Sequence, residues 1–295
     1  MINIDKILAE AIERDASDIH LISGIKPMYR IARELVPTDC CDELNPDDMI
    51  DLYDYFIRGN IDKDKIFKET RKLDSSFDFE GTRLRVNISY EDDVPLFTLR
   101  IIKNTLPTFE QLGVPDIVRR MMYQPQGLVL VTGKTNSGKT TTLNALINDI
   151  NENQNKKILT LESPVEYRHK CKKSIVVQKE VGLGQDSLSY KDGVKNCLRE
   201  DCDILVIGEI RDRETMDAAI ETAEAGHLVI GTLHTKSCAE TIDRMINFYD
   251  ISDQQSVKFL IASLLKLVTS QRLIKSKSGK MVMLPEVMVV DNIVQ

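Results

Sequence analysis

The segment of this chain whose residues most clearly could do chemistry is a glycine-rich octapeptide. Residues 133–140 match the pattern G-x-x-x-x-G-K-T, and they stand between the apolar run Leu128–Thr132 and a helix-compatible stretch at 139–151. The amides of such a loop and the N-terminal end of the next helix bind phosphate oxygens, the lysine contacts the β- and γ-phosphates, and the hydroxyl after it binds Mg²⁺. We predict a nucleotide-binding loop made of Gly133, Lys134, Thr135, Asn136, Ser137, Gly138, Lys139, Thr140 and Thr141, with Thr140 as a Mg²⁺ ligand.

Acidic residues follow two further apolar runs. An ATP-hydrolysing site needs one carboxylate near Mg²⁺ and another that polarises the attacking water, both at strand ends beside the loop. Glu209 comes just after the run Ile204–Ile207, Glu162 ends the run that begins at Ile158, and Glu166 follows four residues later. We predict that Glu209 supports the metal and its water, and that Glu166 or Glu162 polarises the nucleophile. The alternative for each is a solvated glutamate at a strand end.

Two histidines bracket a third apolar run, Leu228–Leu233. An isolated histidine is more often a packing residue than a catalytic one. His234 follows Gly231-Thr232, where a strand tip could bring a polar side chain to the γ-phosphate, so we predict a catalytic role for it. For His227, nucleotide binding and packing are equally compatible with the sequence.

The pattern of the first hundred residues predicts a small α+β domain. Apolar residues repeat at helical spacing between Ile4 and Ile12, and a second helix begins near Asn45, with Met49, Ile50, Tyr53, Phe56 and Ile57 as its apolar face. We expect strands at 19–23, 28–35, 73–79, 82–90 and 96–102, with turns at 80–81 and 91–95.

Residues 103–116 interrupt both periodicities and indicate an interdomain linker, with the boundary near residue 105. Beyond it, short apolar strands alternate with helices, which predicts a parallel sheet covered on both faces. The expected strands are 128–132, 157–161, 174–178, 203–208 and 228–233, and a strand pair near 270–290 closes the chain. The expected helices are 139–151, 190–199, 212–225, 238–247 and 253–268.

Composition restricts the class of protein. A formal charge of −7 without a sustained Lys/Arg block disfavours a nucleic-acid partner. The longest apolar runs are far shorter than the roughly 20 residues of a membrane helix, and the first 20 residues do not form a secretory signal, so we expect a cytoplasmic protein. Six cysteines at scattered spacings, without a C-x-x-C pair, indicate reduced packing thiols: Cys40, Cys41, Cys171, Cys197, Cys202 and Cys238.

The four strand-end segments together resemble the Walker A, Asp box, Walker B and His box of the secretion-type ATPases of type II secretion and type IV pili, and specifically the type IV pilus retraction ATPases. Ala16–Leu21 resembles the opening motif of that family, Leu106–Gly113 its linker, and Gly208–Asp212 its Walker B continuation. The resemblance therefore covers nearly the whole chain, in the expected order.

This resemblance implies an α/β architecture with a PAS-like N-terminal domain at 1–102, the linker at 103–116 and a RecA-like P-loop ATPase domain at 117–295. It implies ATP and Mg²⁺ as cofactors, a homo-hexameric ring, and nucleotide bound between the two domains. A pilus inner-membrane platform protein and a paralogous retraction ATPase are the implied partners. The ring would then be peripheral to the inner face of the cell membrane.

The resemblance also assigns roles to three arginines. Arg83 and Arg85 match residues with which the family reaches nucleotide phosphates in catalysis, and Arg100 matches a further phosphate-binding arginine. From the sequence pattern alone, these are arginines on strands, which most often belong to a solvated face.

Two features favour the retraction branch over pilus assembly or type II secretion ATPases. The opening motif begins at residue 16, which leaves no room for the extra N-terminal domain of assembly enzymes, and Ile274–Gly279 is short and free of the cysteines of their zinc element. The main alternatives are an assembly or secretion ATPase and a low-turnover nucleotide-binding accessory subunit. A nucleic-acid translocase is a further alternative, which the acidic composition disfavours.

Two features depart from the family pattern. Ser163 replaces the aspartate of the usual Glu-Asp-Pro box, so one carboxylate is missing there, and Glu162 and Glu166 would have to sustain catalysis. The sequence ends at Asn292–Gln295, where the family continues into an Ala-Ile-Arg-containing helix. Either the sequence stops short of that helix or this member lacks it.

Overall fold

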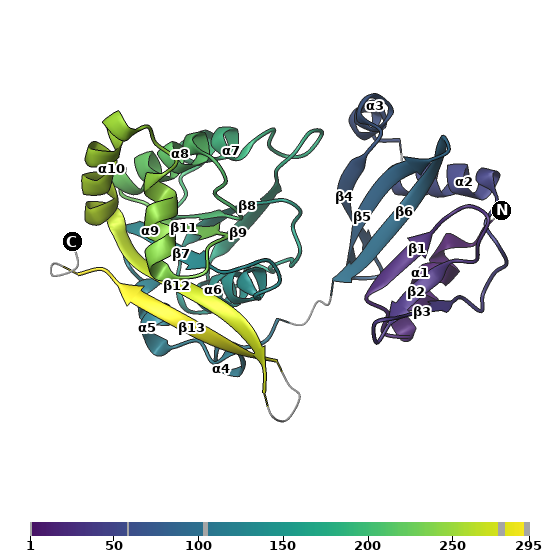
Figure 1. Ribbon diagram of the computed structural model, residues 1–295, viewed down its shortest axis with the longest axis horizontal. Coiled ribbons are helices and arrows are strands. Elements are labelled where there is room, and N and C mark those ends of the chain that lie inside the picture. The colour runs from purple at the N-terminus through teal and green to yellow at the C-terminus, as the bar shows by residue number, and fades with distance from the viewer. Residues whose placement is uncertain (1, 58, 103–105, 277–280, 292–295) are drawn as a thin grey trace. The chain divides into compact units, whose positions relative to one another are not determined.

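Over the residues that it describes, the computed structural model consists of two compact units (Figure 1). The N-terminal unit comprises Met1–Thr105 and Pro164–Tyr167, and the C-terminal unit comprises Leu106–Ser163 and Arg168–Gln295. The described residues are 2–57, 59–102, 106–276 and 281–291. Parts of three segments discussed above lie outside them: residues 103–105 of the expected linker, 277–279 of the cysteine-free segment, and 292–295.

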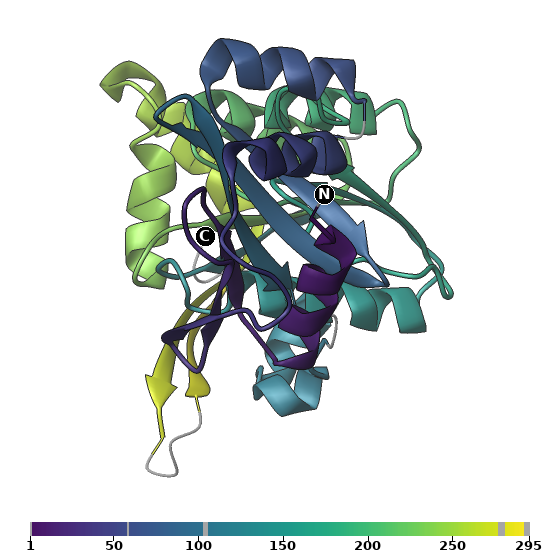
Figure 2. The same ribbon diagram turned by 90° about the vertical axis from the view of Figure 1, so that its right-hand side faces the viewer.

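An antiparallel sheet with the strand order β3-β2-β1-β6-β5-β4 forms the N-terminal unit. Along β5, Leu84, Val86 and Ile88 are buried at every second position, and they share one apolar core with α1, α2 and α3. These helices can be followed in purple and blue in Figure 2. The elements are α1 (Ile4–Glu13), β1 (Asp18–Leu21), β2 (Met28–Ile31), β3 (Glu34–Pro37), α2 (Pro46–Ile57), α3 (Ile61–Thr70), β4 (Leu73–Phe79), β5 (Thr82–Glu91) and β6 (Val94–Ile102).

Two expectations for this unit are wrong. The strand expected at 28–35 is a hairpin, because Ala32 and Arg33 take positive φ angles of 48° and 76° and reverse the chain between β2 and β3. Ile50 is 54% exposed, while Leu52 is buried in its place. Ile50 lies off the stripe that α2 buries, because that stripe follows a spacing of three and four residues from Met49.

One further helix and one strand boundary of this unit also differ from the expectation. The helix α3 had no counterpart in the sequence analysis, and its largely polar composition explains why, since Phe67 is its buried residue. Between β5 and β6, the turn consists of Asp92 and Asp93, both at positive φ, so the strand resumes at Val94 earlier than expected.

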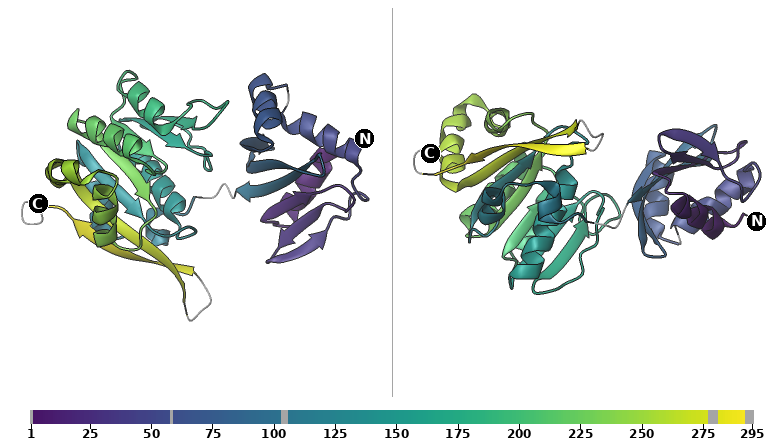
Figure 3. Two further views of the ribbon diagram at one scale, coloured as in Figure 1. Left: turned by 45° about the horizontal axis from the view of Figure 1, so that its top comes forward. Right: turned by 90° about the horizontal axis from the view of Figure 1, so that it is seen from below.

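The sheet of the C-terminal unit has the order β13-β12-β7-β11-β10-β8-β9, and its neighbours are parallel except for β13 against β12. Leu128 and Leu130 of β7 belong to a core with α7, α8, α9 and α10, whereas Val129 and Val131 belong to another with α4, α5 and α6. Alternate side chains of one strand thus enter two cores, so helices cover both faces (Figure 3). The predicted α/β fold with a covered parallel sheet is confirmed.

The elements of this unit follow the expected alternation of strands and helices. The strands are β7 (Gly127–Thr132), β8 (Lys157–Glu162), β9 (Ile175–Glu180), β10 (Ile204–Ile207), β11 (Leu228–Leu233), β12 (Leu265–Lys275) and β13 (Met281–Val289). The helices are α4 (Phe109–Leu112), α5 (Asp116–Met121), α6 (Lys139–Asn153), α7 (Tyr190–Cys197), α8 (Arg213–Glu224), α9 (Cys238–Ile246) and α10 (Ile251–Leu264). Within the described ranges, no helix is both long and apolar enough to cross a bilayer.

The helix expected at 253–268 ends earlier than the sequence suggested. The chain leaves α10 at Leu264 and enters β12 at Leu265, where it pairs in parallel with β7. A short apolar run fits a buried strand as well as a helix, so periodicity alone could not place this boundary.

The expectation of reduced thiols is wrong for one pair of cysteines. Cys197, the last residue of α7, forms a disulfide with Cys202, which lies two residues before β10. The intervening turn includes Asp201 at a φ of 51° and brings the two Cα atoms to 6.1 Å, within the usual range for a disulfide. The C-x₄-C spacing gave no signal in the sequence. The other cysteines, Cys40, Cys41, Cys171 and Cys238, are free thiols.

Candidate nucleotide-binding site

The loop between β7 and α6 has a backbone that favours glycine at two positions. Gly133 has a φ of 150°, and an added Cβ there would overlap Ser137 Oγ and lie 2.5 Å from the main-chain oxygen of Gln271. Gly138, at a φ of 86°, is the N-cap residue of α6. The two glycines therefore let the loop curl closely against β12.

Lys139 is folded back onto this loop. Its Nζ donates to the carbonyl oxygen of Gly133 at 2.8 Å and to that of Lys134 at 3.1 Å. Burial lowers the pKa of the Lys139 ammonium, while the charge of Glu209 opposes that shift. Phosphate oxygens could replace the two carbonyl groups and would form stronger, charge-assisted hydrogen bonds.

His234 lies between Lys139 of the phosphate-binding loop and Glu209, which follows β10. Its Nδ1 lies 3.4 Å from Nζ of Lys139 and 3.5 Å from Oγ1 of Thr135, and its Nε2 lies 3.2 Å from Oε1 of Glu209. A neutral imidazole that is protonated on Nε2 satisfies all three contacts, because it donates to the carboxylate and accepts at Nδ1. The structure therefore brings together three residues that the sequence predicted separately.

Glu209 is fixed from both sides at the end of β10. The amide of Gly208 donates to the carbonyl oxygen of Leu161 at 2.7 Å, and Nη2 of Arg211 donates to Oε2 of Glu209 at 2.5 Å. Burial acts to raise the pKa of Glu209, but the hydrogen bond from Arg211 and the charges of Arg211, His234 and Lys139 outweigh it, so the net shift is downward. The carboxylate is therefore ionised at neutral pH, as a metal or water ligand must be.

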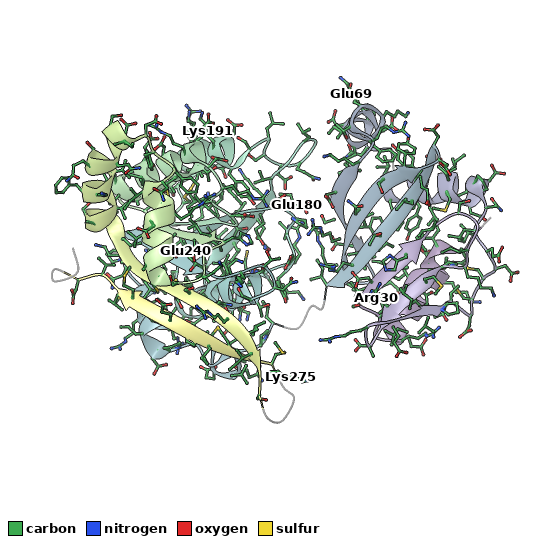
Figure 4. The ribbon with its side chains drawn as sticks, in the orientation of Figure 1. Arg30, Glu69, Glu180, Lys191, Glu240 and Lys275 are labelled. Carbon is green, nitrogen blue, oxygen red and sulfur yellow. A yellow bond between two sulfur atoms is a disulfide. The ribbon has the colours of Figure 1, made fainter. Side chains whose placement is uncertain are left out.

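A cavity of about 550 Å³ opens beside these residues. Glu209, Arg211 and His234 line one side of it, and Glu240 and Arg244 of α9 line another. Figure 4 labels Glu240 on that helix. The ionised Glu209 and its histidine therefore border open space that a ligand and water can enter.

Glu162, at the end of β8, is buried and held by hydrogen bonds. Its Oε1 accepts from Oγ1 of Thr160 at 2.7 Å and from Nε2 of Gln178 at 3.1 Å. Oε1 of Gln178 in turn accepts from the amide of His169 at 2.8 Å. The carboxylate thus has a fixed position at the same edge of the sheet as Glu209.

The same network continues to the helix that follows the phosphate-binding loop. Nε2 of His169 donates to Oδ1 of Asn144 at 2.7 Å, and Nδ2 of Asn144 donates to the carbonyl oxygen of Thr140 at 2.9 Å. Burial, with a smaller contribution from the charge of Lys172, lowers the pKa of His169 to about 4. His169 is therefore neutral at pH 7 and serves as a structural link between Glu162 and the first turn of α6.

The sequence around this site is similar to one family of P-loop proteins. The family model described as "T2SSE: Type II/IV secretion system protein" matches residues 84–290, well over half of the chain. The chain belongs to the type II/IV secretion system protein family. This membership confirms the resemblance found in the sequence and the prediction of an ATPase.

Relatives within the type II/IV secretion system family cover most or nearly all of the chain. The type IV pilus retraction ATPase PilT of Pseudomonas aeruginosa is 37% identical over 97% of this chain and 82% of its own length. A twitching motility protein of Neisseria gonorrhoeae is 41% identical over 73% of this chain and 57% of its own length. The crystal structure of the pilus retraction motor PilT with bound ADP superposes with a TM-score of 0.93 at 37% identity, covering 99% of this chain and 84% of that one.

His227 lies away from the site residues described above. It precedes β11, at the amino end of the strand whose carboxyl end leads to His234. A strand of this length spans about 20 Å. Nδ1 of His227 instead donates to the carbonyl oxygen of Cys202 at 2.8 Å. We therefore leave His227 out of the nucleotide site and interpret it as a packing residue.

The three arginines that the family resemblance singled out belong to the N-terminal sheet, and each pairs there with an aspartate. Their role toward phosphates stays a prediction. The pairs are Arg83 with Asp78 at 2.5 Å, Arg85 with Asp74 at 3.6 Å, and Arg100 with Asp18 at 2.9 Å. Glu166 lies in Pro164–Tyr167, the short segment that clusters with this unit, and its catalytic role also stays a prediction.

The structure adds two polar residues that the sequence analysis did not single out. Tyr190, at the start of α7, places its hydroxyl 3.3 Å from where a Cβ on Gly208 would stand, and burial is the largest of the effects that raise its pKa to about 12. Gln271 of β12 donates from Nε2 to the carbonyl oxygen of Ser137 at 2.8 Å. Neither position belongs to a motif with recognisable spacing, so the sequence offered no signal for these contacts.

Proposed function

We propose that this chain is a motor ATPase that hydrolyses ATP to power type IV pilus retraction and so twitching motility. The observation that supports ATP turnover is the contact of one histidine, His234, with both Lys139 and Glu209. The direction of the motor rests on the relatives, since PilT is named a retraction ATPase and the gonococcal protein a twitching motility protein.

Mg²⁺ would accompany the nucleotide. Mg²⁺ usually takes one or two protein oxygens together with substrate phosphates and waters. Thr140, in the first turn of α6, and the ionised Glu209 suit this arrangement. The described residues contain no cluster of three or more His, Cys, Asp or Glu side chains suited to a metal, which agrees with a metal held largely by the nucleotide.

The remaining polar residues would take part in the hydrolytic step. Attack of water forms a bond to the γ-phosphorus and breaks the bond from that phosphorus to the β,γ-bridging oxygen, so the water must lose a proton as ADP leaves. Glu162 or Glu166 would accept that proton. Lys139 would stabilise the charge on the phosphates, and His234 would sense the γ-phosphate through its contact with Lys139.

The N-terminal unit would make turnover dependent on assembly. We propose a homo-hexamer in which Arg83, Arg85 and Arg100 reach nucleotide phosphates, so that hydrolysis couples to domain movement. Light scattering with ATP and Mg²⁺ tests the ring. A hexamer at micromolar concentration is the expected result, and a monomer would contradict it.

Deletion of the gene tests the direction of the motor. Loss of a retraction ATPase should leave pili extended and abolish twitching, and a plasmid carrying the Lys139→Ala variant should fail to restore it. Loss of surface pili would instead support the alternative of an assembly or secretion ATPase.

The proposed partners are a pilus platform protein in the inner membrane and a paralogous ATPase. With these partners, the ring would lie at the cytoplasmic face of that membrane.

Ser163 motivates the second alternative, a low-turnover nucleotide-binding accessory subunit. It is exposed and supplies no carboxylate where the family pattern has one. Single-turnover hydrolysis distinguishes the two functions. A motor hydrolyses its bound ATP at least as fast as it turns over in the steady state. An accessory subunit keeps its bound ATP unhydrolysed.

A further inference from the structure

Gln271, on β12, is a buried glutamine that contacts the phosphate-binding loop. Its side chain is almost completely enclosed, at 1% exposure, and its Nε2 donates to the carbonyl oxygen of Ser137 at 2.8 Å. These two residues are 134 positions apart in the sequence. The contact therefore depends on the parallel pairing of β12 with β7, which sets Ser270 beside Thr132 at the base of the loop.

The hydrogen bond fixes the peptide group between Ser137 and Gly138. A trans peptide is planar, so its carbonyl oxygen and its N–H point in opposite directions. Because Gln271 turns the carbonyl toward β12, the N–H of Gly138 must point away from β12. Lys139 and His234 meet on that other side of β7, since β11 and β12 flank it on opposite sides.

The backbone of Gln271 packs against one loop glycine and its side chain against the other. An added Cβ on Gly133 would lie 2.5 Å from the main-chain oxygen of Gln271, and one on Gly138 would lie 3.3 Å from its Nε2. A side chain at Gly133 would therefore overlap the backbone of Gln271, and one at Gly138 would stand in tight contact with its amide nitrogen. The residue therefore restrains the loop at both of its glycines.

Two buried polar atoms without hydrogen-bond partners among the described residues indicate that Gln271 has a role besides packing. Its Oε1 and the hydroxyl of Ser137 are buried and have no hydrogen-bond partner within the described part of the chain. Such atoms usually destabilise a fold, so an apolar side chain of similar size would suit a purely packing role better. A buried, half-satisfied glutamine is better explained by the one bond that it makes, to the loop.

We propose that Gln271 is a positioning residue for nucleotide binding. By holding the Ser137 carbonyl, it directs the N–H of Gly138 into the phosphate site before the nucleotide arrives. The inference rests on ATP binding at this loop and holds whether or not the protein drives pilus retraction.

The test compares nucleotide affinity and stability in matched variants. Gln271→Met keeps the length of the side chain and removes the donor, and Ser270→Ala removes an unpaired buried hydroxyl from the adjacent position of the same strand. Calorimetric titration with ADP should show about tenfold weaker binding for Gln271→Met, which corresponds to about 1.4 kcal/mol, and unchanged binding for Ser270→Ala. KM for ATP should rise with kcat unchanged, because the lost contact acts on bound substrate and transition state alike.

A second variant serves if the Gln271→Met protein folds poorly. Gln271→Glu preserves shape but sets a carboxylate oxygen against the Ser137 carbonyl, so it should weaken ADP binding more than Gln271→Met does. Urea denaturation without nucleotide reports whether each variant is folded. A folded Gln271→Met or Gln271→Glu protein that binds ADP within twofold of wild type would overturn the proposal, even if it is less stable.

Discussion

Nδ1 of His234 lies 3.4 Å from Nζ of Lys139, and the opposite ring nitrogen of His234 lies 3.2 Å from Oε1 of Glu209. A single imidazole thus joins the lysine of the phosphate-binding loop to the carboxylate at the end of β10. We therefore expect a phosphate bound at Lys139 to affect Glu209 through this ring. The effect of this ring is one of hydrogen bonding and orientation.

His234→Ala should lower kcat for ATP about 100-fold, because removing one oriented polar group beside developing charge typically has an effect of this size. Binding of ADP should change less than threefold, since Lys139 keeps its contacts with the loop. Steady-state phosphate release and calorimetric titration with ADP measure the two quantities.

His227→Ala is the matched control for this variant. It removes a histidine at the other end of β11, whose partner is the carbonyl oxygen of Cys202. We expect normal ATP turnover with a small loss of stability. If instead His227→Ala lost activity and His234→Ala kept it, the arrangement described above would be wrong.

Gly133→Ala and Gly182→Ala form a pair that separates backbone strain from local crowding. The two glycines have similar φ angles, 150° and 154°, but the nearest atom to an added Cβ at Gly182 is a flexible side-chain carbon of Gln185 at 3.4 Å. At Gly133 the Cβ would meet the backbone of Gln271 at 2.5 Å. Gly133→Ala should lower the free energy of unfolding by about 2 kcal/mol more than Gly182→Ala and abolish ADP binding. Equal losses in urea denaturation would show that the loop is not packed against β12.

His169 should make stability depend on pH in a defined window. Its pKa is lowered from 6.5 to about 4 in the folded protein, mainly by burial. The unfolded chain therefore binds more protons between these values, and folding stability falls as pH drops from 6.5 to 4. The contribution is on the order of 3 kcal/mol at most. Urea denaturation at pH 6.5 and pH 4.5 should show a smaller loss for His169→Gln than for wild type, and identical losses would contradict the assigned burial.

The disulfide between Cys197 and Cys202 predicts a thiol count. The chain has six cysteines, and two of them are paired, so protein purified without reductant and then unfolded should react with four equivalents of a thiol reagent. Peptide mapping should recover the Cys197–Cys202 bridge. Six reactive thiols would support the reduced state that the spacing of the cysteines suggested.

The sequence was sufficient where the chemistry is local. One octapeptide contains Gly133, Gly138 and Lys139, and a strand before it and a helix after it determine most of its geometry. The placement of Glu209 and His234 at one edge of the sheet was predictable for a related reason, because parallel strands bring their carboxyl ends to the same edge.

Contacts between distant segments could not be predicted from the sequence. Gln271 reaches the loop only because β12 pairs with β7 in one register, and residue spacing does not reveal that register. The link from His169 to Asn144 likewise joins a loop residue to a helix 25 positions away. In the N-terminal unit, the hairpin of β2 and β3 was not predicted, because alanine and arginine seldom adopt the positive φ angles of Ala32 and Arg33.

ATP hydrolysis at this site is best tested by phosphate release with ATP and Mg²⁺, measured side by side for wild type, Lys139→Ala and Glu209→Gln. We expect Mg²⁺-dependent turnover by wild type and a loss of at least about 100-fold in each variant, with ADP binding abolished in Lys139→Ala and retained in Glu209→Gln. Turnover at the wild-type rate by either variant, or none by wild type, would contradict hydrolysis at this site.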